Sequence, residues 1–351
     1  MSVSMAKRKA TALDVAKRAG VSRSAVSLVL NGRAEGNVTA ERQERVLRAA
    51  AELDYTPNSV AVSLRNQQTS TIGVITDDIV TSPFAGRLIS GASRTALARG
   101  YMVLVIDSEH DVSRESNAAQ QLAHRQVDGI MYATGSLREV TTPATMRTLP
   151  AILANCTDAA SPFRSVIPAE VDGGRAAAQL LIDLGHRRIT LLSGTLSSPA
   201  APQREQGYRE AMEEAGLGRE QQHVHQTGWD IDDGYRAAAA VLGSGDRPTA
   251  IICSNDRVAT GVLLYAASAG LRVPQDLSVV GYDDQQHVAA NLVPALTTVA
   301  LPHAEIGATA MSMLLDEVEG KAPAAEKPGG GTVLVPCRIV TRASTGVPPS
   351  S

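Results

Sequence analysis

The stretch TALDVAKRAGVSRSAVSLVLNG, residues 11–32, decides the first part of the fold. Thr11 and, three residues later, Asp14 form the pattern of a capping box at the start of a short helix. Gly20 ends that helix, and Ser22 can cap a second one. A helix, a glycine-containing turn and a second short helix together predict a helix-turn-helix motif.

A third helix after Thr39 is expected to complete a small all-α core. Each of the three helices carries apolar residues at helical spacing, so each has one face to bury. These apolar residues are Leu13, Ala16, Ala19, Val26, Val29, Leu30, Val46, Leu47, Ala50 and Leu53. Pro57 then prevents the third helix from continuing, and the short segment SVAVSLRNQQ, residues 59–68, follows.

From Ser70 onward the pattern changes to apolar runs that alternate with amphipathic helices. The first series of expected strands contains TIGVI (71–75), YMVLVI (101–106), DGIMYA (128–133) and PAILAN (150–155); the second contains RRITLLSG (187–194), TAIICSND (249–256) and LSVVGYDD (277–284). Near-continuous apolar strands with crossover helices are typical of parallel sheets that are covered on both faces. Two such series predict two α/β subdomains, with a small-molecule site in the crevice between them.

The composition separates the chain into two electrostatically different parts. The 351 residues predict two or three folding units, and their 33 basic and 36 acidic side chains give a net charge of −3. Residues 1–66 hold 11 basic and 6 acidic side chains (+5), whereas residues 67–351 hold 22 and 30 (−8). The basic first part suits a nucleic-acid partner, and the acidic remainder does not.

Several protein classes are excluded by composition. A hydrophobic content of 44% is enough for a packed core, so the chain is not a disordered one. We expect no membrane span and no signal peptide, because no apolar run is long enough and the N-terminus lacks an apolar segment. Three scattered cysteines, Cys156, Cys253 and Cys337, are expected to be free thiols of a cytoplasmic protein. The final segment STGVPPSS, residues 344–351, is expected to be disordered.

Two stretches resemble the headpiece and hinge of the lactose/galactose-repressor (LacI/GalR) family. They are residues 11–32, quoted above, and residues 38–65, VTAERQERVLRAAAELDYTPNSVAVSLR. The resemblance extends over nearly the whole chain. It includes the blocks TIGVI, LGHRRI, PTAIICSND, GLRVPQDLSVVGYDD, PALTTV and GATAMSMLLDEVEG. It implies a helix-turn-helix headpiece joined to a periplasmic-binding-protein-like α/β body of two parallel-sheet subdomains, which together act as a sequence-specific transcriptional repressor.

This resemblance predicts the domain boundaries. We expect the headpiece in residues 1–56 and a hinge helix and linker in residues 57–70. The body is expected in residues 71–345, with a tail at 346–351. Within the body, the expected first subdomain combines residues 71–164 and 297–325, and the second combines residues 165–296 and 326–345.

The residues expected to contact DNA lie on the second helix and in the hinge. Arg23 can read guanine through its planar fork, while Leu28 offers an apolar contact such as a thymine methyl. In the family, the hinge folds on the operator and inserts a Leu into the minor groove, a role that matches Leu64; an inert linker is the alternative. The full set expected to bind DNA is Ser22, Arg23, Ser24, Ser27, Leu28, Asn31, Asn58, Ala61 and Leu64.

The residues expected to bind an effector follow the strands of the body. Arg204 matches the family's arginine that binds ligand hydroxyls or a carboxylate, and Trp229, the only Trp, offers an indole face for a sugar ring. The full set is Asp77, Phe84, Asn155, Arg204, Trp229, Asn255, Asp256 and Asp283. Structural alternatives stay open, since a strand-end Asp also caps helices and Trp229 also suits a core.

The expected partners are a pseudo-palindromic operator, a carbohydrate effector, and a second copy of the chain in a homodimer. We expect no cofactor, no metal and no membrane contact, with the protein in the cytoplasm on the nucleoid. Departures from the family at Pro168 and Leu301 leave the particular sugar open, and the absence of an Arg just before Arg204 disfavours a purine.

Three other functions compete with this interpretation. An enzyme is disfavoured because the chain has no nucleophile elbow, Walker A loop, dinucleotide turn or C-x-x-C pair, and His223 and His225 on a polar loop are more typical of solvated residues. A sugar-binding protein without a DNA role would share the body but not the basic headpiece. A regulator that needs no ligand would share both.

Overall fold

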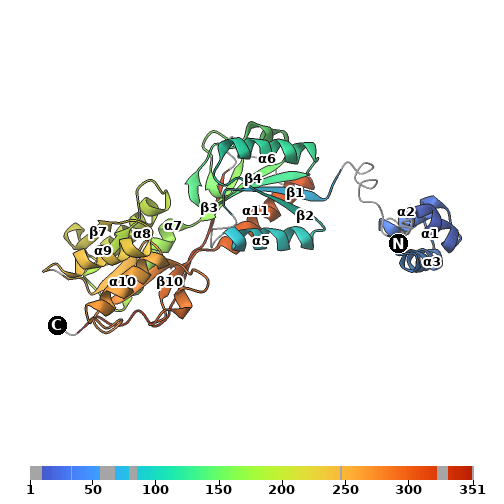
Figure 1. The fold of residues 1–351 in the computed structure, drawn as a ribbon. Coiled ribbons are helices and arrows are strands. Elements are labelled where there is room, and N and C mark those ends of the chain that lie inside the picture. Colours follow the sequence, from blue (N-terminus) through green and yellow to red (C-terminus); the bar gives the residue numbers. More distant parts are fainter. Residues whose placement is uncertain are drawn as a thin grey trace, which may run out of the picture. The chain divides into compact units, whose positions relative to one another are not determined.

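The computed structural model describes residues 10–32, 34–55, 68–78, 85–245, 247–321 and 331–349. The chain forms two compact units, Met1–Thr69 and Ser70–Ser351 (Figure 1). Within the described residues, no helix combines the length and the apolar character that crossing a bilayer requires. We refer to the first unit as the headpiece and to the second as the body.

The headpiece contains three short helices, α1 (Ala12–Ala19), α2 (Arg23–Leu30) and α3 (Ala40–Glu52). The predicted caps of the first two are confirmed. The Thr11 side chain accepts from the backbone of Asp14, and the Asp14 carboxylate accepts from the backbone of Thr11, which completes a capping box. The Ser22 hydroxyl accepts from the backbone N–H of Ala25 at 3.1 Å. Thr39 precedes α3 without a side-chain capping bond.

The headpiece core corrects the predicted apolar faces at two positions. Leu13 and Leu47 are 52% and 54% exposed, respectively. The core is formed instead by residues one or two positions away, together with the predicted alanines and valines: Val15, Ala16, Ala19, Val26, Val29, Ala34, Val46, Ala49 and Ala50. The reason is that successive helical residues are rotated by about 100°, so the crossing angle of short helices decides which of two adjacent apolar stripes is covered.

The body contains two six-stranded sheets, as the alternation of strands and helices predicts. The first has the strand order β11-β5-β4-β3-β1-β2 and the second β12-β10-β9-β8-β6-β7. All pairings are parallel except that of β12 with β10. The first sheet contains β1 (Thr71–Thr76), β2 (Met102–Asp107), β3 (Gly129–Glu139), β4 (Ala151–Thr157), β5 (Arg164–Pro168) and β11 (Thr332–Val335); the second contains β6 (Ile189–Ser193), β7 (Gln222–Gln226), β8 (Ala250–Cys253), β9 (Ser278–Asp283), β10 (Thr297–Ala300) and β12 (Arg338–Val340).

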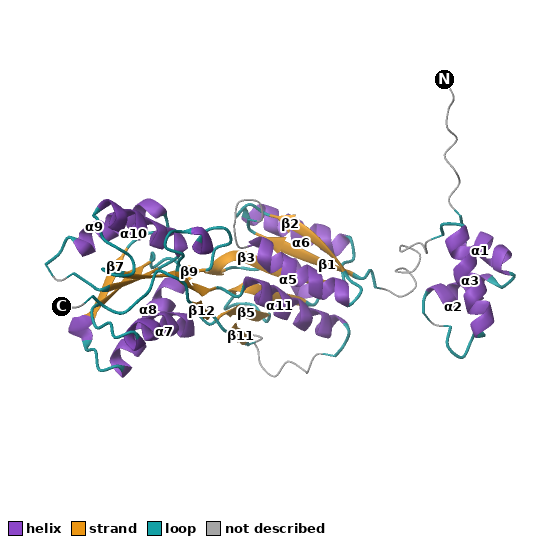
Figure 2. Cartoon of the chain, turned by 90° about the horizontal axis from the view of Figure 1, so that it is seen from below, coloured by secondary structure: helices purple, strands orange, loops and turns teal. Residues whose placement is uncertain are grey.

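Helices cover both faces of each sheet, so each subdomain has two apolar layers (Figure 2). The first sheet packs against α5 (Ala85–Ala98) and α11 (His303–Val318) on one face and against α6 (Val112–His124) on the other. The second packs against α7 (Glu170–Asp183) and α8 (Ala200–Glu214) on one face and against α9 (Ile231–Leu242) and α10 (Asp256–Ser268) on the other. Short 3₁₀ turns lie at Ala144–Thr148, Arg219–Gln221 and Ala289–Asn291.

The chain passes between the two sheets after β5, after β10 and after β11, which corrects the expected subdomain boundaries. Residues 165–168 and β11 were assigned to the second subdomain but belong to the first sheet, where β11 pairs with β5. Residues 297–300 were assigned to the first subdomain, but β10 pairs with β9 in the second sheet. Apolar runs predict that a segment is a strand, but only the pairing partner decides which sheet it joins.

The C-terminal segment is also different from the prediction, because its described part is docked rather than disordered. Ser344 is fully buried; its carbonyl accepts from the N–H of Val279, and its hydroxyl accepts from the N–H of Thr297. The buried imidazole of His186 lies 2.9 Å from the Gly346 carbonyl. These bonds satisfy backbone groups of β9 and β10, so residues 344–346 complete the second subdomain. The three cysteines are free thiols, as predicted, and Cys156 and Cys253 are buried.

Candidate effector site and DNA-reading surface

A cavity of about 300 Å³ lies where the chain passes between the two sheets of the body. Its wall contains residues from both subdomains: Gly135, Ser136, Leu137, Asn155, Glu170, Ser198, Ala200, Arg204, Trp229, Asn255, Arg257, Asp283, Leu301 and His303. Of the eight residues predicted to bind an effector, the structure brings five together here: Asn155, Arg204, Trp229, Asn255 and Asp283. The volume is at the lower end of the roughly 300–1,000 Å³ usual for small-molecule sites.

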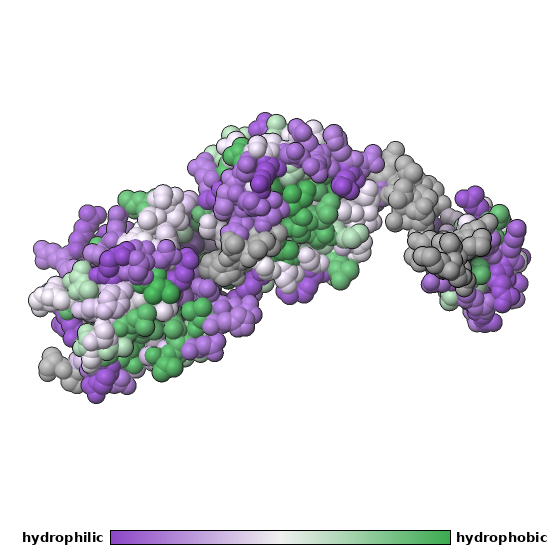
Figure 3. Space-filling view, viewed as in Figure 1, coloured by the Kyte–Doolittle hydropathy of each residue, from purple (hydrophilic) through white to green (hydrophobic). Residues whose placement is uncertain are grey.

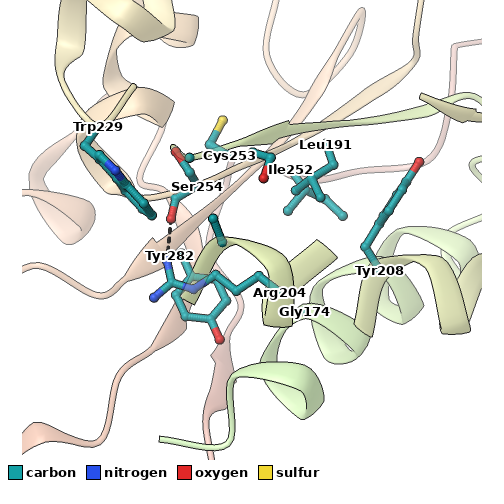
Figure 4. A pocket seen from close by; sticks show the side chains of 12 residues that line it. Gly174, Leu191, Arg204, Tyr208, Trp229, Ile252, Cys253, Ser254 and Tyr282 are labelled. Atoms are coloured by element: carbon teal, nitrogen blue, oxygen red, sulfur yellow. Dashed lines mark hydrogen bonds between the residues drawn. The ribbon is translucent and has the colours of Figure 1, made fainter. Parts of the chain in front are cut away.

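The guanidinium of Arg204 is held by contacts on several sides. Its Nε and Nη2 donate to the two carboxylate oxygens of Glu170, each at 2.8 Å. Its Nη1 donates to the Ser254 carbonyl at 2.5 Å, and the guanidinium lies 3.6 Å from the ring centroid of Tyr282 (Figure 4). Burial disfavours the charge of Arg204, but the Glu170 carboxylate outweighs that effect and raises the pKa of Arg204.

The close approach of α7 and α8 makes the pairing of Glu170 with Arg204 possible. A Cβ at Gly174 would lie 2.1 Å from the Arg204 carbonyl oxygen, and one at Gly207 would lie 1.9 Å from that of Val171. Only glycine fits at these two positions, since any side chain would push the helices apart. Helix α8 begins at Ala200, so Arg204 lies one turn inside the helix.

Trp229 is fixed against the loop that follows β6. A Cβ built on Gly194 would lie 2.2 Å from the Trp229 ring, and the indole N–H donates to the Thr195 hydroxyl at 3.0 Å. The ring is half-buried, so the alternative of a plain core residue does not describe it. A smaller hollow of about 10 Å³, enough for one water molecule, lies between Trp229, Arg204 and Tyr208 (Figure 4).

Two ionisable residues of the cavity wall are strongly desolvated. Burial raises the pKa of Asp283 well above its usual value, with the carboxylates of Asp256 and Glu170 adding to the shift and Arg204 opposing it. Burial, assisted by the charges of Arg87 and Arg204, lowers the pKa of His303 to about 4. The neutral imidazole of His303 therefore predominates at neutral pH.

The remaining predicted effector residues lie elsewhere. Asp77 is buried at the end of β1, where it accepts from the N–H of Gly135 at 2.9 Å and pairs with Arg138. Asp256 is fully buried and accepts from the Thr298 hydroxyl and the Gln285 N–H, both at 2.6 Å. Neither side chain lines the cavity. Phe84 lies outside the described residues.

Three ionisable residues of the cavity wall were missed by sequence reasoning: Glu170, Arg257 and His303. Glu170 and His303 both lie directly after a passage of the chain between the sheets, at the first residues of α7 and α11. Acidic residues are common in the first turn of a helix, so the sequence alone did not distinguish Glu170 as a site residue. Arg257, beside the predicted Asn255 and Asp256, is a third wall residue and pairs with Asp230 at 3.4 Å.

The headpiece presents its predicted DNA-binding residues on the face of α2. Ser22, Arg23 and Ser24 are exposed at its N-terminus. An open groove of about 600 Å³ on this face contains Ser22, Ser24 and Leu28, and also two basic residues that sequence reasoning did not single out, Lys17 and Arg42. The predicted residues Ser27 and Asn31 are partly buried and bond to each other, with the Asn31 amide donating to the Ser27 carbonyl and hydroxyl. Asn58, Ala61 and Leu64 lie outside the described residues.

Comparison with known proteins supports both halves of this description. A family model for "Periplasmic binding proteins and sugar binding domain of LacI family" matches residues 69–343, and one for "Bacterial regulatory proteins, lacI family" matches residues 11–58. The chain belongs to the LacI family of bacterial regulatory proteins. It is therefore a DNA-binding regulator of the repressor type with a ligand-binding body, as the resemblance of the sequence predicts.

Individual LacI-family members match most of the chain. The ribose operon repressor of Haemophilus influenzae is 34% identical, covering 88% of this chain and 92% of its own length. The transcriptional repressor PurR of Proteus mirabilis is 33% identical, covering 95% and 96%. Among solved structures, the Lac repressor dimer bound to operator and the anti-inducer ONPF has a TM-score of 0.76 at 30% identity and covers 97% of this chain and 100% of its own. The regulator CelR in complex with cellobiose has a TM-score of 0.65 at 27% identity, with 95% and 99% covered.

Proposed function

We propose that this LacI-family protein is a homodimeric repressor whose affinity for a pseudo-palindromic operator is controlled by a carbohydrate bound in the cavity between its subdomains. The observation that carries the proposal is the convergence of Asn155, Arg204, Trp229, Asn255 and Asp283 on one wall. They come from separate strands and helices of both subdomains, as a ligand-responsive site requires.

The chemistry of the cavity suits a sugar. Carboxylate and amide oxygens accept hydrogen bonds from ligand hydroxyls, and the guanidinium and amide N–H groups donate to them. The indole of Trp229 can cover the apolar face of a pyranose. Among the described residues, no three His, Cys, Asp or Glu side chains gather as a metal site would require. The cellobiose complex of CelR is a precedent for a carbohydrate ligand on this fold.

The headpiece is proposed to read DNA through α2. Arg23 suits guanine in the major groove, while Lys17 and Arg42 beside the groove suit phosphates, which position the helix without reading sequence. In the hinge, Leu64 is proposed as the minor-groove wedge, and Asn58 and Ala61 as further DNA contacts. The local charge of +5 supports a salt-dependent interaction.

Exposed apolar side chains of the body suggest where a second copy of the chain docks. Figure 3 shows hydrophobic side chains gathered over α5 and β2 in the first subdomain and over α10 in the second. Leu97 and Met102 are 75% and 69% exposed, and Leu264 is 53% exposed beside a surface groove that also contains Ile231 and Tyr235. Because both subdomains carry such patches, a shift of one subdomain relative to the other would change the dimer interface.

In this mechanism the effector binds one arrangement of the two subdomains better than the other. By linkage, it then changes operator affinity by a coupling free energy of about 1–3 kcal/mol.

A gel shift against the upstream region of the protein's own gene, with and without a panel of sugars, tests the proposal. We expect one sugar to change the fraction of bound DNA. Arg204→Gln should retain operator binding and lose that response; glutamine is preferable to alanine because it leaves Glu170 with a hydrogen-bond donor. A response that survives Arg204→Gln would place the effector elsewhere, and a protein that binds no DNA would favour a sugar-binding role alone.

A further inference from the structure

The positive charge of Arg204 is already compensated inside the cavity wall. Glu170 accepts from two different nitrogens of Arg204 at 2.8 Å, and the side chains of Glu170 and Arg204 are 1% and 9% exposed, respectively. A buried, two-point ion pair is held in one geometry, and neither partner is screened by water. An arginine in this state is a hydrogen-bond donor without a net charge to offer a ligand.

The donors of Arg204 are only partly used by the protein. Of its five N–H groups, three donate to Glu170 and to the Ser254 carbonyl among the described residues. One N–H on each terminal nitrogen remains for ligand oxygens. All N–H groups of a guanidinium lie in its plane, so these two donate to ligand atoms within the plane of the Arg204 guanidinium. The ring of Tyr282 covers one face of that plane. This geometry suits a pair of neighbouring hydroxyls.

The other ionisable groups of the wall offer an anion no uncompensated positive charge. Asp283, which is 6% exposed, adds a second carboxyl group to that of Glu170. His303 adds no charge at neutral pH, because burial lowers its pKa to about 4. The remaining cation, Arg257, is paired with Asp230 at 3.4 Å. The wall as a whole therefore presents no excess of positive charge.

We infer that Glu170 is a specificity-determining residue, which neutralises Arg204 so that the cavity accepts uncharged, polyhydroxylated effectors and excludes those with a carboxylate or phosphate. The inference rests on the proposed effector site and narrows its ligand class. An anionic group at Arg204 would also lie beside Glu170, and buried like charges repel strongly. We expect acidic ligands to bind at least about tenfold more weakly than matched neutral ones.

Inorganic sulfate tests the role of Glu170 without reference to any sugar, because Trp229 is the only Trp and reports on the cavity by fluorescence. In the wild type, sulfate should cause no saturable change in Trp229 fluorescence. Glu170→Gln leaves Arg204 uncompensated, so sulfate should bind and also raise the melting temperature. Glu170→Asp keeps the negative charge, so it should not bind sulfate, like the wild type. The double variant Glu170→Gln, Arg204→Gln lacks the arginine and should not bind sulfate either. Saturable sulfate binding to the wild type, including binding through Arg257, would overturn the inference. Failure of Glu170→Gln to bind sulfate would overturn it as well.

Matched sugars test the ligand class. D-glucose and D-glucuronate, and D-galactose and D-galacturonate, differ mainly in one carboxylate, and thermal shifts compare their binding. The wild type should discriminate against the acid of any pair that it binds, and Glu170→Gln should narrow that difference. Equal or tighter binding of an acid by the wild type would overturn the inference while the effector site stands. If no sugar binds but Glu170→Gln gains sulfate, the carbohydrate proposal fails and the role of Glu170 is supported.

Discussion

Asn255 ties the start of α10 to the backbone of Trp229. Its side-chain oxygen accepts from the N–H of Val258 at 2.8 Å and so caps the helix, while its amide nitrogen donates to the Trp229 carbonyl at 2.9 Å. One buried side chain thus serves helix stability and cavity shape through different atoms. This division of roles allows the two contributions to be separated by mutation.

Asn255→Ser should retain most of the stability and lose effector affinity. Serine keeps a capping oxygen without adding a buried charge, and it lacks the amide group that donates to the Trp229 carbonyl. Asn255→Ala loses both atoms, so it should also lower the free energy of unfolding by about 1–2 kcal/mol. Urea unfolding and Trp229 fluorescence titration measure the two effects. Equal destabilisation by both substitutions would show that the two roles are not separable.

Gly194→Ala should disturb the cavity through Trp229. The added methyl group would lie 2.2 Å from the indole ring, which must therefore move away from the loop and from its bond with Thr195. We expect a red-shifted Trp emission and at least about tenfold weaker effector binding, since a displacement of about 1 Å in a site is costly. Gly218→Ala, where a Cβ meets nothing within 4 Å, is the matched control. An unchanged emission spectrum would contradict this packing.

Asp256 and Asp283 should respond differently to substitution, although the sequence suggested one role for both. Asp256→Ala removes the acceptors of Thr298 and Gln285, so it should reduce the free energy of unfolding by about 2–3 kcal/mol. Asp283→Asn should instead weaken effector binding with little loss of stability, because it removes a desolvated acid that faces the cavity. Chemical denaturation and calorimetric titration of both variants make the comparison. Effector binding unaffected by Asp283→Asn would remove it from the site.

His303 should make the protein less stable as the pH falls from about 6.5 to about 4. The unfolded chain binds a proton at the ordinary pKa of 6.5, whereas folded His303 does so only near 4, so acid favours unfolding in this window. The contribution is about 3 kcal/mol. His303→Gln removes it. Asp256 has a pKa raised to about 6, and the pKa of Asp283 is also raised, so both carboxyl groups make the protein more stable as the pH falls. Both are present in the wild type and in His303→Gln, so their effect cancels in the comparison. Parallel stability profiles for wild type and variant would contradict the prediction.

Arg23→Ala should relax base preference at one position of each operator half-site. A bidentate contact to guanine is worth about 1–3 kcal/mol of discrimination, so the preference at that base pair should fall by this amount. Lys17→Ala is the comparison, because loss of a phosphate contact should weaken all sequences equally and reduce the salt dependence. Binding to a library of half-site variants distinguishes the two. Unchanged preference in Arg23→Ala would remove it as a base reader.

Local chemistry explains why much of this protein was predictable. The capping pair of Thr11 and Asp14 and the cap at Ser22 lie within a few residues of their partners, so the helix-turn-helix could be inferred from spacing alone. The alternation of apolar strands and helices fixed the class of the body for the same reason. Arg204 and Trp229 were found because they match ligand-binding positions of the family, and Asn255 because it follows a predicted strand.

The tertiary structure decided what depends on contacts between distant residues. Leu13 and Leu47 lost their predicted place in the core because helix crossing selected the neighbouring stripe. Residues 344–346 became ordered through bonds to β9 and β10, and β10 and β11 joined sheets that no local pattern specifies.

The clearest case is Glu170. The sequence by itself determined an acidic residue at the start of a helix. Only the contact of two helices at Gly174 and Gly207 made it the buried partner of Arg204, because charge compensation depends on distance in space and not on separation along the chain.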